Sequence, residues 1–127
     1  MRTQLNDWQI RVRENQDEMK YINLKHTTVA HSPSEIVIYP IPFPDGVLGV
    51  NIKTIRVQSV EAVPFFIDLM DGASNETIYE SLEEMQKQYD QVDLPYKPVE
   101  KKLFVRIHNK GNVATKFSID IRGIEVK

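Results

Sequence analysis

The three histidines are the side chains of this sequence best suited to acid–base chemistry, because imidazole titrates near neutral pH. His26, His31 and His108 fall on three separate predicted segments or at their ends. The five-residue spacing between His26 and His31 matches neither one face of a helix nor one face of a strand. No serine lies in a G-x-S-x-G motif, and the sequence contains no cysteine that could act as a nucleophile. The sequence therefore predicts ordinary surface or turn histidines, no catalytic residue and no enzyme.

An acidic stretch at residues 68–76 is the best candidate for a metal site. It places Asp68 and Glu76 on either side of Gly72 and offers the hard oxygen ligands that Ca²⁺ prefers. It does not match the D-x-[DN]-x-[DN]-G pattern of EF-hand loops, and the absence of cysteine excludes a thiolate metal site. An acidic loop capped by Ser74 is the simpler interpretation, so we expect no metal site and no cofactor.

A proline-rich segment at residues 39–46 carries the candidate interaction surface. Proline at every second position favours an extended backbone with few hydrogen-bond donors, which does not suit an interior strand. Two interpretations are open: the segment folds back over the core, or it protrudes into a neighbouring subunit. In the second case the candidate interface consists of the side chains Tyr39, Ile41, Phe43, Val47 and Leu48.

Aromatic residues near the predicted strand ends suggest a second kind of binding site, because sugar-binding sandwiches stack sugar rings on such side chains. The preferred interpretation is that these rings close the open ends of the core. The residues concerned are Trp8, Tyr39, Phe43, Tyr79, Tyr89 and Tyr96.

Charge and hydropathy exclude several kinds of partner. A net charge of −2 gives no overall attraction to nucleic acid, and no apolar run approaches the ~20 residues that span a membrane. The first eight residues are polar and do not resemble a signal peptide. Charge is nevertheless uneven: residues 61–93 hold nine acidic residues and one lysine, and residues 100–127 hold seven basic and three acidic residues. Either these regions attract one another within the domain, which we prefer, or copies pack head to tail.

The clearest element prediction is a β-hairpin near the end of the sequence. Apolar and polar side chains alternate over residues 103–108 and again over 117–122, which is the period of a half-buried strand. Residues 109–112, Asn-Lys-Gly-Asn, tolerate the positive φ that a hairpin turn requires. The alternation changes phase at Gly123, which indicates a β-bulge or a final strand covered on both faces.

Shorter alternating runs extend this pattern through the chain. The runs at residues 55–57 and 65–69 predict a second hairpin-like pair, in which Pro64 begins a strand because proline cannot donate to the ladder. The remaining runs are residues 8–12, 22–24 and 36–39.

One segment departs from strand periodicity. Ile78, Leu82, Met85 and Tyr89 form one stripe of a helix over residues 77–89. A strand at residues 77–79 followed by an acidic loop is the alternative, and we prefer the helix. The chain of 127 residues has the usual size of one domain. We therefore predict a single mostly-β domain over residues 1–127, an antiparallel β-sandwich or jelly-roll-like fold with one short helix.

The closing strands resemble those of small β-sandwich accessory proteins of tailed-phage virions. The resemblance is carried by residues 94–96, 102–109 and 117–123, and residues 55–69 fit the same pattern. It implies a non-catalytic structural protein, a capsid decoration or tail-associated subunit, that self-associates or docks on a capsid or tail lattice. The runner-up is a carbohydrate- or cell-surface-binding module, and a small enzyme of unknown reaction comes third. The expected location is the virion, with the cytoplasm as the alternative.

Overall fold

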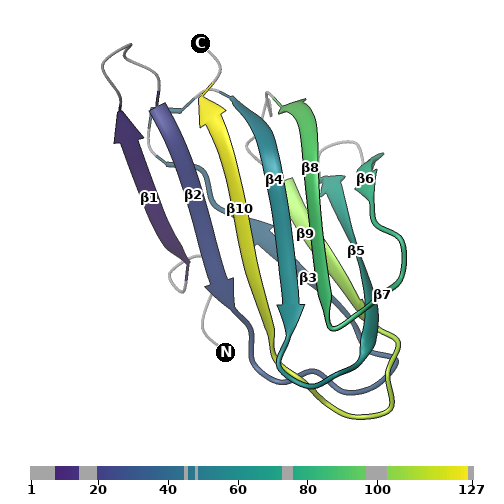
Figure 1. Ribbon diagram of the computed structural model, residues 1–127. Helices are drawn as coiled ribbons and strands as arrows, with labels where there is room; N and C mark the ends of the chain where they lie inside the picture. Colours follow the sequence, from purple (N-terminus) through teal and green to yellow (C-terminus); the bar gives the residue numbers. More distant parts are fainter. Residues whose placement is uncertain are drawn as a thin grey trace.

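The protein is an antiparallel β-sandwich, as the sequence predicts (Figure 1). The computed structural model describes residues 8–14, 20–44, 46–47, 49–72, 76–96 and 103–125, and these residues contain no α-helix. None of them forms a helix long and apolar enough to cross a membrane. The strands are β1 (Gln9–Glu14), β2 (Lys20–Thr27), β3 (Ile36–Ile41), β4 (Val50–Ser59), β5 (Pro64–Asp71), β6 (Glu76–Glu80), β7 (Glu84–Met85), β8 (Lys87–Tyr96), β9 (Leu103–Asn109) and β10 (Phe117–Glu125).

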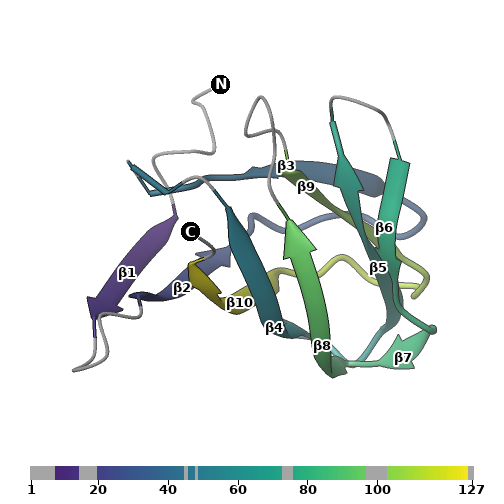
Figure 2. The same cartoon turned by 90° about the horizontal axis from the view of Figure 1, so that it is seen from above.

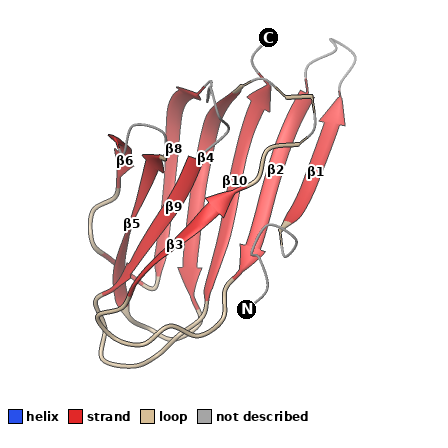
Figure 3. Ribbon diagram, turned by 180° about the vertical axis from the view of Figure 1, so that it is seen from behind, coloured by secondary structure: helices blue, strands red, loops and turns tan. Residues whose placement is uncertain are grey.

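Two sheets form the layers of the sandwich. Sheet A has the order β1-β2-β10-β4-β8, and sheet B has the order β3-β9-β5-β6 with β7 also pairing with β5. Seen from above, β1 lies at the outer end of sheet A, while β8 approaches the β6 end of sheet B (Figure 2). Seen from behind, β3 and β9 of sheet B lie in front of sheet A (Figure 3). Each sheet therefore has one face toward the core and one outer face.

The core lies between the sheets and is built from the inward-facing alternate residues of the strands. Phe65 of β5 and Phe117 of β10 are fully buried, and their ring centroids are 5.1 Å apart. Since β5 and β10 belong to different sheets, this aromatic contact joins the two layers.

Both predicted hairpins are wrong, although their strands are correct. β9 and β10 lie in different sheets, and so do β4 and β5, so each connection crosses the sandwich. In the β9–β10 connection, the buried Asn109 amide donates to the carbonyls of His31 and Val113 at 3.2 and 3.1 Å. Its oxygen accepts from the Gly111 amide at 2.8 Å, and a Cβ on Gly111 would lie 2.5 Å from Val63 Cβ. The Asn-Lys-Gly-Asn segment therefore shapes a crossing between sheets and not a hairpin turn.

The predicted helix over residues 77–89 is also wrong. β6 pairs with β5, so the strand interpretation of residues 77–79 is the correct one. Ile78 packs against the core, but Leu82 and Tyr89 are 81% and 51% exposed, so the proposed stripe does not form a buried face. The run of Thr, Ile and Tyr has the β-branched and aromatic composition that favours a strand.

Two local predictions at strand level are confirmed. β5 begins at Pro64, and the register of β10 against β4 shifts between Arg122 and Gly123 as a bulge requires. A Cβ on Gly123 would lie 2.5 Å from Val50 Cγ1 and 2.7 Å from the Asn51 carbonyl oxygen. Glycine is therefore needed at the bulge because the neighbouring strand approaches too closely for a side chain.

We expect Gly123→Ala to lower the free energy of unfolding by about 2 kcal/mol, because the added methyl group forces β10 and β4 apart. Urea denaturation would measure the change. Gly46→Ala is the control, since a Cβ there meets nothing within 4 Å and only the φ of +82° opposes alanine. That strain costs about 1 kcal/mol. Equal losses in the two variants would contradict steric exclusion at the bulge.

Candidate interaction surface

The sequence predicts an interface in the proline-rich segment, but the described side chains of that interface face the core of the folded protein. Tyr39, Ile41 and Val47 are buried in the core, and Phe43 packs against it. Leu48 lies outside the described residues. The segment thus follows the first interpretation and folds back over the core. The reason is that β3 pairs with β9, which sends alternate side chains inward, and an edge strand such as β3 tolerates proline.

The outward-facing residues of the same strand belong to a different surface. Residues directly opposite each other on paired strands point to the same side of a sheet. The register of β3, β9 and β5 therefore gives three rows on the outer side of sheet B, which together we call the apolar face. The rows are Ile36, His108 and Phe66; Ile38, Arg106 and Asp68; and Pro40, Phe104 and Met70.

The apolar face differs from the usual outer face of a sandwich. Antiparallel sheets commonly turn polar side chains to solvent, whereas six of these nine residues are apolar. Ile36 and Ile38 are 54% and 55% exposed, and the other apolar members are half-buried. Apolar side chains that gather on an outer face are candidates for contact with another molecule.

An ion pair lies at the centre of the apolar face. Arg106 donates from Nε and Nη2 to Asp68 Oδ2 at 2.8 and 2.5 Å. The Asp68 side chain is only 5% exposed and that of Arg106 is 35% exposed. The guanidinium carries five N–H groups, so three are not used by these two bonds. The pair also joins the acidic region at residues 61–93 to the basic region at residues 100–127 within one sheet.

His108 lies at one end of the apolar face. Its ring meets the edge of Phe66 with centroids 4.7 Å apart. Burial lowers the pKa of His108 below its usual value, and the charges of Lys110 and Arg106 lower it further. Asp68 and Glu83 act in the opposite direction. At neutral pH the ring is therefore uncharged and behaves as part of an apolar surface.

The other two histidines are buried in an aromatic cluster, which corrects the prediction that they are surface residues. His26 stacks on Trp8 with centroids 5.0 Å apart and an interplanar angle of 19°. Its ring is also 5.2 Å from that of Tyr39, which approaches His31 at 5.7 Å. The sequence could not show this contact because β2 and β3 lie in different sheets and meet only across the core.

His31 forms the middle of a carboxylate–imidazole–phenol chain. Its Nδ1 lies 3.3 Å from Glu35 Oε2, and its Nε2 hydrogen-bonds the Tyr39 hydroxyl. Burial raises the pKa of Tyr39, so the phenol keeps its proton at neutral pH. The Ser32 amide donates to Glu35 at 2.8 Å and lowers the pKa of that carboxyl. The chain fixes the β2–β3 connection and offers no activated nucleophile.

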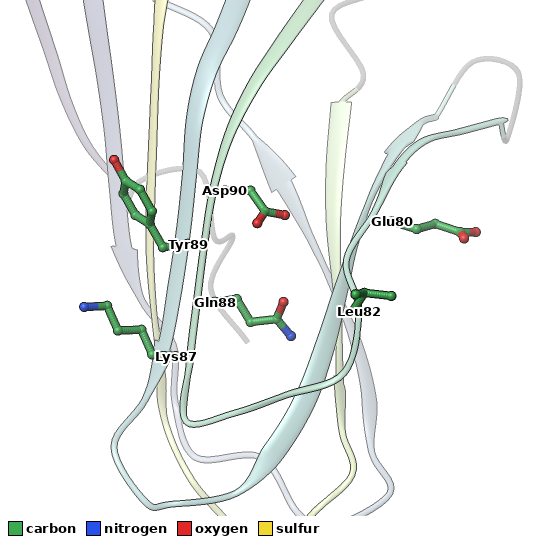
Figure 4. A pocket seen from close by; sticks show the side chains of 6 residues that line it. All are labelled: Glu80, Leu82, Lys87, Gln88, Tyr89 and Asp90. Carbon is green, nitrogen blue, oxygen red and sulfur yellow. The ribbon is translucent and has the colours of Figure 1, made fainter.

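A crevice lies at the edge of the sandwich, lined by residues of β6, β8 and the segment between them (Figure 4). Gln88 and Asp90 point into it, while Lys87 and Tyr89 point to the other side of β8. Gln88 donates to the Phe65 carbonyl, and the Tyr79 hydroxyl donates to Asp90. The polar groups of this crevice thus close the open edge between the two sheets.

The acidic stretch considered for calcium is split by the fold. Asp68 lies in β5 and binds Arg106, whereas Asp71 and Glu76 are opposite each other on β5 and β6. Residues 73–75 lie outside the described part of the chain. Within that part, no group of three His, Cys, Asp or Glu residues could hold a metal ion.

No protein-family model matches this chain, and no curated protein matches it. Among solved structures, a chain of the cyanophage Pam1 capsid asymmetric unit is similar at 14% identity, with a TM-score of 0.45, over 92% of this chain and 86% of that one. The CBM22-1–GH10 modules of Clostridium thermocellum endo-1,4-beta-D-xylanase 10B give 14% identity and a TM-score of 0.37, over 97% of this chain and 26% of that one. The C-terminal CBM6 of LamC from Zobellia galactanivorans gives 8% identity and a TM-score of 0.30, over 94% and 90%. None of these three TM-scores reaches 0.5, so these likenesses indicate no function for this chain.

Proposed function

We propose that this chain is a non-catalytic assembly subunit that binds a second copy of itself through the apolar face. The observation that carries the proposal is the group of six apolar side chains on the outer side of sheet B. Removing apolar surface from water is favourable by about 25 cal/mol per Å². A partner that covered these six side chains would gain this free energy on binding. Aromatic residues, methionine and arginine are enriched at protein–protein interfaces, and the apolar face carries all three kinds.

A second copy suits the apolar face because its central row is self-complementary. The row of Ile38, Arg106 and Asp68 continues to Glu80, which is opposite Asp68 on β6. A two-fold axis parallel to the strands would place the Arg106 side of one copy over the acidic side of the other. The two apolar rows would then face the same rows of the second copy, with residues of β9 over those of β5. An isologous dimer is the commonest arrangement that such a face supports.

The role of an accessory subunit in a phage virion, on the capsid or the tail, is the finer part of the proposal. It is supported by the resemblance of residues 94–96, 102–109 and 117–123 to the closing strands of such proteins. The non-catalytic part is supported by the positions of the three histidines. His26 and His31 are packed into the aromatic cluster, and His108 is part of the apolar face.

Light scattering over a range of protein concentrations, at low and high salt, tests the proposal. We expect a dimer whose fraction rises with concentration and persists at high salt, because burial of apolar surface is not screened. A dimer that dissociates in high salt would indicate head-to-tail packing of charges instead. A monomer at every concentration would contradict association of the chain with itself.

We expect the dimer to weaken as the pH falls from about 8 to about 5, the range in which histidine titrates. The pKa of His108 is below the ordinary value of 6.5, so the folded protein favours the neutral ring. A partner that buries the ring further would lower this pKa again, so the dimer loses stability as the pH falls through the pKa of His108 in the monomer, which lies below 6.5. The dimer fraction should be measured against pH for wild type and for His108→Gln, whose side chain stays neutral. The same pH dependence in both proteins would rule out His108 as its origin.

A further inference from the structure

The outer side of sheet A carries a different surface, on the opposite side of the sandwich from the apolar face. The registers of β1, β2, β10, β4 and β8 place residues from all five strands in two rows across it. We call this surface the cationic face. One row is Gln9, Lys25, Asp120, Arg56 and Tyr89, and the next is Arg11, Asn23, Arg122, Thr54 and Gln91.

Positive charge dominates the cationic face. Its two rows contain four basic residues and one acidic residue, and Arg13 extends the positive charge along β1. Arg11, Arg13 and Arg56 are exposed, and no carboxylate of the described residues lies within ion-pair distance of them. A surface that concentrates one sign of charge attracts ligands of the opposite sign.

The single carboxylate of these rows orders its neighbours. Asn23 donates to Asp120 at 2.6 Å, Arg122 Nε lies 3.4 Å from the same oxygen, and Lys25 Nζ lies 4.0 Å from the other oxygen. One negative charge is therefore shared by two cations and an amide. This arrangement holds Asn23 and Arg122 in place and leaves the face positively charged.

Three shallow hollows form a continuous series across the cationic face. Lys25 lines the first and second, Arg122 lines the second and third, and Arg56 lines the first and third. Because neighbouring hollows share lining residues, the three together extend from β1 to β8. Its shape suits an extended ligand that lies across the strands.

Aromatic rings lie at both ends of this series. Tyr89, 51% exposed, is opposite Arg56 at the β8 end, and Tyr21 is opposite Arg13 at the β1 end. The apolar face of a sugar ring stacks on such phenol rings, and a guanidinium binds a carboxylate through two parallel hydrogen bonds. The amide of Asn23, between them, can bind hydroxyl groups.

We propose that the cationic face binds an acidic polysaccharide, a polymer of uronic acids, lying across the five strands. A uronic acid offers both a carboxylate for the guanidinium groups and an apolar ring face for the phenol rings, and side chains of both kinds line the hollows. The site does not depend on the proposed self-association. A dimer joined through the apolar face would present two cationic faces outward, and binding by both would raise the overall affinity.

Isothermal titration calorimetry with polygalacturonate, neutral galactan and single-stranded DNA tests this proposal. We expect the wild-type protein to bind polygalacturonate, with affinity falling as salt rises, and to bind neutral galactan at least tenfold more weakly. Arg56→Gln should lower the affinity for polygalacturonate about tenfold, because it removes one charge-assisted contact. Lys116→Gln, which removes an exposed charge in the β9–β10 connection, should leave the affinity unchanged.

Two further results separate this proposal from general attraction between charges. Tyr89→Ala keeps every charge and should weaken polygalacturonate binding about fivefold or more through loss of ring stacking. Ile38→Lys, on the apolar face, should leave the intrinsic affinity of each site unchanged even if the protein becomes monomeric. Absence of polygalacturonate binding, equal binding of neutral galactan, or tighter binding of DNA would each overturn the proposal, and none of them bears on self-association.

Discussion

A lysine at position 38 is expected to raise the dissociation constant of the dimer at least about 100-fold. Ile38 is 55% exposed at the β3 side of the apolar face and is opposite Arg106 on β9. Ile38→Lys removes a large apolar contact and introduces a charge that must be desolvated in the interface. Together these effects cost about 3 kcal/mol or more, and each 1.4 kcal/mol is a factor of ten in affinity. Sedimentation or light scattering over a concentration series would measure the change.

Val60→Lys is the matched control for this prediction. Val60 is 61% exposed in the connection between β4 and β5, away from the apolar face. The substitution is chemically similar and should leave the dimer unchanged. Both positions point to solvent in the monomer, so both variants should unfold within about 0.5 kcal/mol of wild type. An equal loss of dimer in both variants, or an intact dimer in Ile38→Lys, would show that the apolar face is not the interface.

The sequence predicts β9 and β10 correctly because their inward-facing residues alternate with a period of two. That period identifies the buried face of β9 and β10 but says nothing about which strand each one pairs with. The same alternation is compatible with a hairpin and with two strands in opposite sheets. In the folded protein, Asn109 and Gly111 shape the connection between the two strands. The buried Asn109 amide group hydrogen-bonds three backbone groups, and Val63 leaves no room for a Cβ at Gly111. Such contacts depend on the folded geometry and cannot be read from spacing.

The interface predicted from the sequence and the apolar face proposed above lie on opposite faces of the same strand. Tyr39 and Ile41 of β3 point inward, while Ile38 and Pro40 point outward. The sequence does contain an indication of the apolar face in the partner strands β5 and β9. Phe65-Phe66-Ile67 and Leu103-Phe104-Val105 are apolar at consecutive positions. In an antiparallel strand, consecutive apolar residues mean that both faces are apolar, and only one can face the core.

The cationic face could not be predicted from the sequence for a different reason. Its basic residues come from β1, β2, β4 and β10, at positions as distant as Arg11 and Arg122. Only the strand order β1-β2-β10-β4-β8 brings them together. The sequence does show a surplus of basic residues over 100–127. Two of these residues lie on opposite sides of the sandwich: Arg106 of β9 is on the apolar face, and Arg122 of β10 is on the cationic face.

Arg106→Leu is expected to lower the free energy of unfolding by about 3 kcal/mol, the second large effect that the structure predicts. The Asp68 side chain is 5% exposed and accepts two hydrogen bonds from Arg106. Leucine removes both donors and leaves a nearly buried carboxylate without a cation, which costs far more than the loss of an exposed ion pair. Urea denaturation of wild type and variant would measure the difference.

The double variant Asp68→Leu, Arg106→Leu decides whether this loss comes from the unpaired carboxylate or from the packing of the arginine side chain. If the cause is the carboxylate, removing it should restore most of the stability, because a buried ion pair can be replaced by apolar side chains at little cost. If the cause is packing of the arginine stem against neighbouring residues, the double variant should be no more stable than Arg106→Leu. We expect recovery to within about 1 kcal/mol of wild type. Recovery would mean that the ion pair serves mainly to satisfy the nearly buried carboxylate of Asp68.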